Sequence, residues 1–318
     1  MTSASRHTNR SAAHRTLRRE VPSTAAVLAD ERDFTAMRRY RTFPFDDHGS
    51  YLQQMETLLR TLAAQGVLTT LSLFDPAAFE KYCAEQDLDP DRPDSRTRYT
   101  AEAARTGARV TYEGEPLRQL LPLLVEEADR QVAWNHAAAL LARAGSCDDC
   151  GADLAHAAFA RATQALQQLL TSLGGGTHHL VCSVAAGEPS LLAVLRATDG
   201  ATDGAGDRLR LAESETLVFC TVLATGLALR LPGGIVSRTT ADPTGPAGSA
   251  HHGATAGPRR DTVRGWSLRD SWLRPLTAAE VFTAYCTDAD SGEPIPPEPG
   301  VDYAAGLPLD PPPDAHDH

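Results

Sequence analysis

The sequence has no apolar stretch long enough to cross a membrane. The longest, residues 217–231, is interrupted by two threonines, a glycine and an arginine, and it falls short of the roughly 20 residues that a spanning helix needs. Residues 20–30 have neither the apolar segment nor the cleavage site of an export signal. We therefore expect no membrane partner and a cytoplasmic location.

Cysteine is scarce, because the 318 residues include only six. Their low number and irregular spacing argue against the disulfide framework of a small secreted protein. Two of them, Cys147 and Cys150, form a Cys-x-x-Cys pair in a polar setting. The others lie in apolar surroundings, where a thiol behaves as a small buried hydrophobe; they are Cys83, Cys182, Cys220 and Cys286.

Short motifs of the common catalytic classes are missing. No glycine-rich phosphate loop, Walker lysine or dinucleotide fingerprint follows any predicted strand, and neither a nucleophile elbow nor a protease signature occurs. The sequence therefore predicts no specific reaction. A noncatalytic regulatory or ligand-binding protein is the leading hypothesis, because the chain is well patterned for folding and yet carries no catalytic motif.

Positive charge is concentrated at the start of the chain. The formal net charge is -11, yet the first 20 residues contain five arginines and one glutamate. An acidic body repels nucleic acid, and a short arginine-rich tail is most often a solvated, disordered segment. We therefore expect no nucleic-acid partner, whereas a protein partner or a homo-oligomer stays open.

A hydrophobic content of 42% in a chain of 318 residues is sufficient for one large domain or two ordinary ones. The apolar pattern predicts five segments: a disordered basic tail at 1–24, an α/β unit at 25–146, the Cys-x-x-Cys turn with a connecting helix at 147–176, a β-rich half at 177–287 and a Pro-rich acidic tail at 288–318. The tail is expected to fray. The β-rich half contains two loops that are expected to be flexible, 198–207 and 240–260.

The first half alternates strands with helices. Strands are predicted at 41–45, 67–74 and 108–112, and the capping-box spacing of Ser50 and Gln53 predicts a helix between the first two. Helices that alternate with strands through short turns favour parallel crossover connections. We therefore expect a mixed α/β fold that begins with a doubly wound, Rossmann-like unit.

The second half begins with a helix and continues as strands. An apolar stripe from Ala155 to Leu173 predicts the helix, which ends at three consecutive glycines. A short helix with a capping box at Thr277 and Glu280 is expected later. Between the two helices, strands are predicted at 178–184, 191–197, 208–211, 217–223 and 227–231. This pattern predicts a mixed or antiparallel sheet, either in a second domain or as an extension of the first sheet.

Acidic residues follow the predicted strands of the first half. They are Asp46 and Asp47 with His48 after the first strand, Asp75 after the second, and Glu113 and Glu115 after the third. If these strand ends meet at one sheet edge, the carboxylates could hold Mg²⁺ against a substrate phosphate while His48 acts as a base. The alternative function is therefore a magnesium-dependent enzyme acting on a phosphate-containing substrate. The competing interpretation is structural, because each acid precedes a helix that it can cap.

The pair Cys147 and Cys150 lies in a turn between two helices, where both sulfurs can point to one place. A structural Zn²⁺ ion would need two more ligands. The candidates are His156, His178, His179 and Cys182. The alternatives are an exposed loop with two reduced thiols and a redox pair, although the two intervening aspartates oppose thiolate formation.

Overall fold

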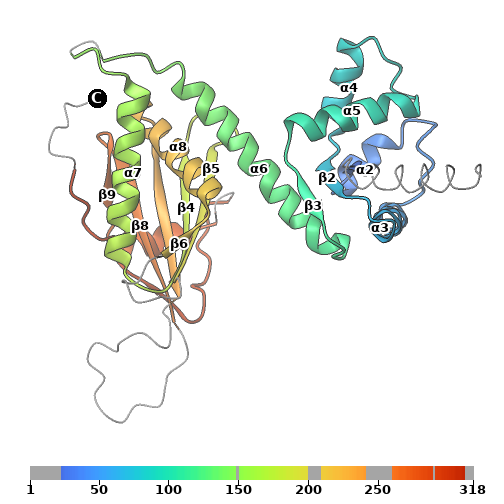
Figure 1. Ribbon diagram of the computed structural model, residues 1–318. Helices are drawn as coiled ribbons and strands as arrows, with labels where there is room; N and C mark the ends of the chain where they lie inside the picture. The colour runs from blue at the N-terminus through green and yellow to red at the C-terminus, as the bar shows by residue number, and fades with distance from the viewer. Residues whose placement is uncertain (1–22, 148–149, 200–208, 241–259, 289–290, 312–318) are drawn as a thin grey trace, which may run out of the picture. The chain divides into compact units, whose positions relative to one another are not determined.

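The computed structural model describes residues 23–147, 150–199, 209–240, 260–288 and 291–311 (Figure 1). It confirms the mixed α/β class, with eight helices and two separate sheets in the described residues. The chain forms two compact units, residues 1–131 and 132–318. The boundary falls inside helix α6 (Leu117–Leu141). We call the two parts unit 1 and unit 2.

Unit 1 is built on a sheet with the strand order β1-β2-β3. Its elements before α6 are β1 (Ser23–Val27), α2 (Glu31–Met37), α3 (His48–Ala64), β2 (Thr69–Leu73), α4 (Pro76–Glu85), α5 (Pro93–Thr106) and β3 (Val110–Tyr112). Strands β1 and β2 are parallel and are joined through α2 and α3. Strand β3 is antiparallel to β2, so the sheet is mixed.

Strand β1 corrects the predicted start of the ordered chain. Ser23 and Thr24 pair with residues of β2, although the sequence places them in the tail 1–24. Only Val27 is fully buried among the five residues of β1, so the strand has little apolar pattern to reveal it. The remainder of the predicted tail, residues 1–22, lies outside the described residues.

Residues 41–45 do not form the predicted strand. They belong to the loop between α2 and α3, and their two phenylalanines pack against other aromatic rings. The ring of Phe43 lies 5.6 Å from that of Phe34 and 5.9 Å from that of Tyr51, measured between centroids. The apolar side chains of this segment therefore serve a core cluster and not a sheet.

Aspartates begin the helices that follow this loop and strand β2. Asp75 accepts hydrogen bonds from two backbone amides of α4 at 2.8 and 3.0 Å, as the sequence predicts. Helix α3 is capped by Asp47, whose carboxylate accepts a hydrogen bond from the Ser50 amide at 2.7 Å. The predicted cap was Ser50 itself, so the helix begins earlier than expected.

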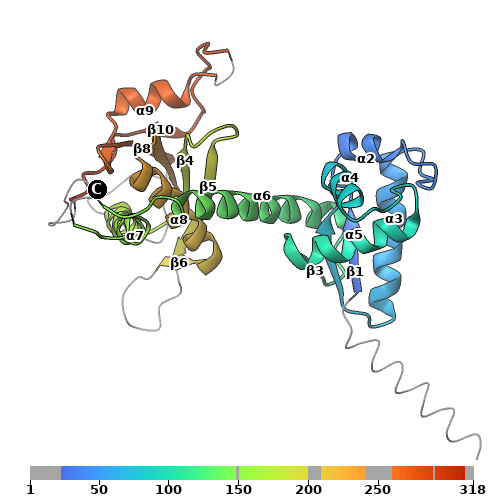
Figure 2. The same ribbon diagram turned by 90° about the horizontal axis from the view of Figure 1, so that it is seen from above.

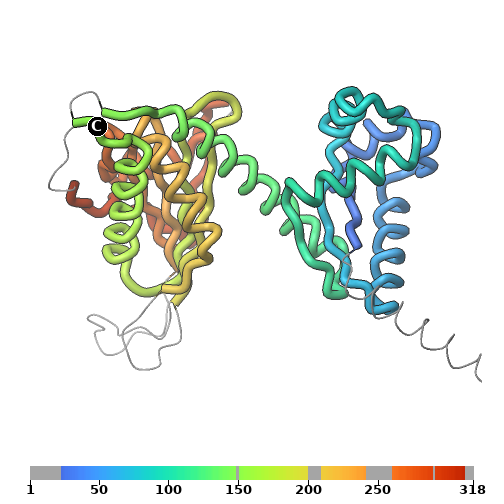
Figure 3. Tube along the Cα trace, turned by 45° about the horizontal axis from the view of Figure 1, so that its top comes forward, coloured from blue at the N-terminus to red at the C-terminus, as the bar shows by residue number. Residues whose placement is uncertain are grey.

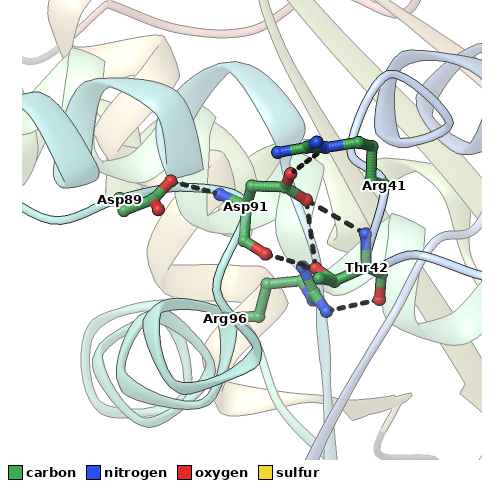
Figure 4. Close-up of polar contacts among 5 residues, drawn as sticks. All are labelled: Arg41, Thr42, Asp89, Asp91 and Arg96. Atoms are coloured by element: carbon green, nitrogen blue, oxygen red, sulfur yellow. Dashed lines mark hydrogen bonds and ion pairs between the residues drawn. The ribbon is translucent and has the colours of Figure 1, made fainter.

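Asp91, in the turn before α5, fixes the loop between α2 and α3 (Figure 4). Its carboxylate accepts hydrogen bonds from the Thr42 amide at 3.0 Å and from Arg41 Nε at 3.2 Å. The Thr42 hydroxyl donates to the Asp91 carbonyl oxygen, and Arg96 Nη2 donates to the Thr42 carbonyl oxygen at 2.8 Å. The donors that reach the carboxylate, chiefly the Thr42 amide and then Arg41, hold the pKa of Asp91 below its ordinary value.

We predict that Asp91→Ala lowers the midpoint of thermal unfolding at pH 7. Because the pKa of Asp91 is lowered in the folded protein, its carboxylate stabilises the fold above the unfolded pKa of roughly 4, and this contribution is lost as the pH falls through the folded pKa. Circular dichroism melts from pH 2 to pH 7 should show the two midpoints converging in acid. The control is Asp46→Ala, a nearby exposed acid. Equal losses in both variants at pH 7 would contradict the prediction.

Unit 2 is a largely antiparallel sheet with α7 and α8 on one face (Figure 2). The strand order is β10-β8-β7-β4-β5-β6, and β9 also pairs with β8. The elements after α6 are α7 (Leu154–Leu173), β4 (Thr177–Val184), β5 (Leu191–Asp199), β6 (Leu209–Leu211), α8 (Glu213–Leu229), β7 (Gly233–Thr240), β8 (Asp261–Arg269), β9 (Trp272–Pro275), α9 (Ala278–Tyr285) and β10 (Val301–Tyr303). Only β10 is parallel to its neighbour, which agrees with the predicted sheet type.

The alternating burial of β4 shows which face the helices cover. Leu180, Cys182 and Val184 are fully buried, whereas His179 and Ser183 on the opposite face are exposed. The buried side chains join those of α7 and α8 in one core cluster. The four cysteines expected to act as buried hydrophobes are all buried, with at most 5% of their surface exposed.

The strands predicted at 217–223 and 227–231 are wrong, because this segment forms helix α8. The helix is apolar all round and packs against α7, β4 and β5. Gly226 permits this packing, since a Cβ atom there would lie 2.5 Å from the Leu268 side chain. A helix buried on every side has no amphipathic period that the sequence could reveal. Among the described residues, no helix is both long and apolar enough to cross a bilayer.

The end of the chain is packed up to residue 311, where the sequence predicts fraying from 288. Trp266 Nε1 donates to the Leu307 carbonyl oxygen at 2.8 Å, and Trp272 Nε1 donates to that of Leu309 at 3.1 Å. Leu309 is itself 7% exposed. Two indole donors thus hold a segment whose own composition gives no sign of order. Residues 289–290 and 312–318 lie outside the described residues.

We predict that deleting residues 304–318 destabilises the protein, whereas deleting 312–318 does not. The longer deletion removes two indole hydrogen bonds and the burial of Leu309, which together contribute on the order of 3 kcal/mol. Urea unfolding followed by tryptophan fluorescence measures the difference, because both indoles are reporters. Identical unfolding midpoints for the two deletions would show that the packed segment contributes nothing.

Candidate ligand-binding groove

A turn of three glycines joins α7 to β4 at one end of unit 2 (Figure 3). Gly174 caps α7 with a φ of 76°, and its amide donates to the Leu170 carbonyl oxygen at 3.3 Å. Gly176 has a φ of 124°, and a Cβ atom there would lie 2.9 Å from the Thr240 carbonyl oxygen. The turn therefore passes close to the end of β7. Its backbone conformation is one that residues other than glycine rarely adopt.

His178 fixes this turn from the buried side. The residue has no exposed surface, and its Nε2 lies 2.9 Å from the Gly174 carbonyl oxygen. Its Nδ1 lies 3.0 Å from the Thr239 hydroxyl. A carbonyl can only accept, so Nε2 donates the hydrogen bond to Gly174. The next residue, His179, is exposed on the opposite face of β4.

Asp199, at the end of β5, faces the same turn. Its Oδ2 accepts a hydrogen bond from the Gly176 amide at 2.8 Å, and its carboxylate lies over Gly175, where a Cβ atom would be 3.7 Å away. Its Oδ1 is buried and has no hydrogen-bond partner among the described residues. An unsatisfied buried acceptor costs about 1 to 3 kcal/mol. The Asp199 carboxylate therefore has incomplete hydrogen bonding within the described part of the chain.

An open groove of about 680 Å³ lies between the end of α7 and the paired ends of β5 and β6. It is lined by Gln167, Leu170, Thr171, Gly174, Gly175, Asp199, Leu209 and Leu211. The register pairs Leu209 with Asp199 and Leu211 with Ala197, so both leucines project to the helix-covered face. Among the described lining residues, Asp199 has the only charged side chain. The groove thus combines an apolar wall, exposed turn backbone and one carboxylate.

The sequence missed Asp199 as a functional candidate. It lies in the duplicated Thr-Asp-Gly unit, which the sequence assigns to the flexible loop 198–207, and residues 200–208 lie outside the described residues. The other predicted loop, 240–260, lies almost wholly outside them as well. Two features of the sequence could have indicated this site. One is an acid at the end of a clearly predicted strand, and the other is the run of three glycines.

The acidic residues predicted at the strand ends are used as caps or lie apart. Asp47 and Asp75 cap α3 and α4, and Glu115 accepts a hydrogen bond from the Glu113 amide at 3.1 Å. Asp46 is exposed. Among the described residues, no three His, Cys, Asp or Glu side chains are grouped so that they could hold a metal ion. This arrangement does not support the magnesium-dependent alternative.

His48 is engaged in the core of unit 1. Its Nε2 lies 2.9 Å from the Leu28 carbonyl oxygen, and its Nδ1 lies 3.5 Å from Glu31 Oε2. The ring also packs against Phe34 and Tyr51. A histidine held by a backbone carbonyl and two aromatic rings positions α3 against β1, which is a structural role.

The edge of unit 1 that follows β1 and β2 carries acids that the sequence analysis overlooked. The pKa of Asp33 is raised by partial burial and by the negative charges of Asp30 and Asp75. Asp30 caps α2 by accepting a hydrogen bond from the Asp33 amide at 2.7 Å. Because β1 itself was missed, these residues were not recognised as lying at a strand end.

The turn that contains Cys147 and Cys150 is closed by backbone hydrogen bonds. The Cys147 amide donates to the Ala152 carbonyl oxygen, and the Gly151 amide donates to that of Cys147, both at 2.8 Å. Two of the proposed further zinc ligands are committed elsewhere, because His178 holds the glycine turn and Cys182 is buried in the helix–sheet core. The described residues bring no third metal-binding side chain to the pair.

The comparisons with known proteins concern unit 1 alone. Residues 12–115 match a domain of unknown function, DUF8829. The match covers about a third of the chain and extends just past β3. No curated protein and no solved structure matches the chain. The groove of unit 2 therefore lies outside the segment with a recognised relative.

We predict that Cys150 reacts with a maleimide in the native protein much faster than Cys182 and Cys220. Cys150 is exposed, whereas the other two are buried, and burial raises the pKa of the Cys182 thiol to about 12. The thiolate is the reacting species, so few Cys182 molecules are competent near neutral pH. Peptide mass spectrometry after timed labelling gives the rates, with urea-unfolded protein as the reference. Comparable labelling rates for all three cysteines in the native protein would contradict this prediction.

Proposed function

We propose that this protein is a noncatalytic regulatory or ligand-binding protein, and that the groove of unit 2 holds its small-molecule ligand. The observation that carries the proposal is Asp199, whose Oδ2 is bonded to the glycine turn while its Oδ1 lacks a partner among the described residues. Ligand sites typically combine an apolar wall with a few placed polar groups. The groove volume of about 680 Å³ also suits a small molecule.

The composition of the lining favours binding over catalysis. Among the eight lining residues that the structure describes, Asp199 has the only ionisable side chain. Acid–base or nucleophilic catalysis usually needs a second group that activates the first. His178 is close to the turn, but both of its ring nitrogens are already bonded and the ring is wholly buried. A bound molecule would therefore meet recognition groups and no paired catalytic groups from the described residues.

We also propose that the protein acts in the cytoplasm. The support is the use of cysteine, because four of the six lie in cores as buried apolar side chains and not in the disulfide framework of a secreted domain.

We predict that small molecules perturb the glycine turn of the native protein and that Thr171→Trp prevents this. Full-length protein labelled with ¹⁵N-glycine would be titrated with a mixture of cationic, neutral and anionic six-carbon fragments, and the amide shifts of residues 174–176 followed. Gly175→Ala assigns one signal, since Gly175 lacks the positive φ of its neighbours. Thr171 is an exposed residue of the lining, so a tryptophan there should fill the groove without disturbing the core.

The matched control for that experiment is Leu192→Trp. Leu192 is 53% exposed and lies on the sheet face away from the helices. The Leu192→Trp substitution adds the same indole ring to unit 2, at a distance from the groove. If no fragment of any charge shifts the turn amides, or if Leu192→Trp abolishes the shifts as fully as Thr171→Trp, the proposed function is wrong.

A further inference from the structure

We infer that the ligand of the groove is an organic cation, a protonated amine that carries an apolar chain. This inference rests on the proposed function and adds the chemical class of the ligand. Three independent features of the groove support it, namely the state of the Asp199 carboxylate, the end of helix α7 and the leucine wall.

The first feature is that no cation offsets the charge of Asp199 among the described residues. Within that part of the chain, the Gly176 amide is the one hydrogen-bond donor that reaches its carboxylate. The nearest basic side chain in sequence on β6, Arg210, pairs with Thr198 and therefore projects to the opposite face from Asp199 and Leu209. A carboxylate that lines an open groove without a cation attracts one from outside the chain.

The second feature is the polarity of helix α7. The C-terminal end of an α-helix carries partial negative charge, which favours nearby cations. The last turn of α7 contains no basic residue, and the groove is lined there by Leu170, Thr171 and Gly174. The helix end and Asp199 thus both make the electrostatic potential in the groove more negative.

The third feature distinguishes an organic cation from a metal ion. A hard divalent metal ion takes six or more oxygen ligands, or several with bound water, and no group of three metal-binding side chains occurs in the described residues. An apolar wall is present instead, formed by Leu170, Leu209 and Leu211. Leu211 is 37% exposed, so an alkyl or aryl chain that covers it would remove apolar surface from water.

The test compares three probes with the same six-carbon chain. Hexylamine is protonated at pH 7, because alkylamines titrate near pH 10, whereas 1-hexanol is neutral and hexanoate is anionic. Full-length protein labelled with ¹⁵N-glycine is titrated with each probe, and the amides of residues 174–176 report on the groove. We expect hexylamine to bind about tenfold more tightly than 1-hexanol, since a hydrogen bond to a charged group contributes more than a neutral one. Hexanoate should bind least.

The matched variants are Asp199→Asn and Asp270→Asn. An asparagine at 199 keeps an oxygen that can accept from the Gly176 amide, so the turn is preserved while the charge is lost. It should reduce hexylamine binding to the level of 1-hexanol. Asp270 is an exposed acid of the same unit, and its substitution should leave all three affinities unchanged.

The outcomes separate this inference from the proposed function. If 1-hexanol or hexanoate shifts the turn amides as strongly as hexylamine, or if Asp199→Asn leaves hexylamine binding intact, the amine class is wrong while the groove remains a binding site. If none of the three probes shifts these amides at concentrations up to their solubility, both ideas fail. Tighter binding of hexylamine that Asp199→Asn alone removes would establish the cation site.

Discussion

Helix α8 carries apolar side chains on every side, and 11 of its 17 residues are buried. Such a helix must be covered all round, so the rest of unit 2 is arranged to enclose it. The sheet covers one side through β4 and β5, and α7 covers another. The end of α6 adds a third, where the Thr225 hydroxyl lies 3.4 Å from the Ala137 carbonyl oxygen. The two buried threonines of α8, Thr221 and Thr225, also donate their hydroxyls to carbonyls of the same helix, so these hydroxyls need no water.

This enclosure sets the position of the groove. Because α7 must lie against α8, its last turn ends at the edge where β5 and β6 pair, and the chain must reverse at once to enter β4. Three glycines permit the reversal, His178 bonds the turn from within, and Asp199 bonds it from β5. The candidate site is thus a consequence of the packing of two helices on a sheet. Its charged residue stabilises the turn through one oxygen, while the other is buried without a hydrogen-bond partner among the described residues.

The success of sequence-based prediction followed the pattern of burial. Elements with one buried face were found, including α7, β4 and the capping box of α9, because their apolar residues recur with the period of the element. Helix α8 was taken for two strands because it is buried on all sides. Strand β1 was missed for the opposite reason, since only one of its residues is fully buried. The periodicity of apolar residues reflects a difference in burial between the two faces of an element. An element whose faces are equally buried or equally exposed has no such periodicity.

The same limit applies to the candidate site. A position after a predicted strand marks an acid as a candidate ligand, but the same position is also that of a helix cap. Asp47, Asp75 and Asp153 each accept hydrogen bonds from the first turn of a helix. The Asp91 carboxylate accepts hydrogen bonds from the Thr42 amide and the Arg41 guanidinium. What sets Asp199 apart is that its Oδ1 is buried without a hydrogen-bond partner among the described residues, a property of three-dimensional packing.

Burial gives a physical criterion for separating structural from functional carboxylates in this protein. The helix-capping acids Asp47 and Asp75 are also bonded through Oδ1 alone, but both residues are exposed, so water can bond the second oxygen. Asp91 accepts hydrogen bonds through both of its oxygens. The second oxygen of Asp199 is buried and has no partner among the described residues, which is unfavourable unless a donor is supplied. We therefore favour the groove of unit 2 over the acidic edge of unit 1 as the candidate for recognition.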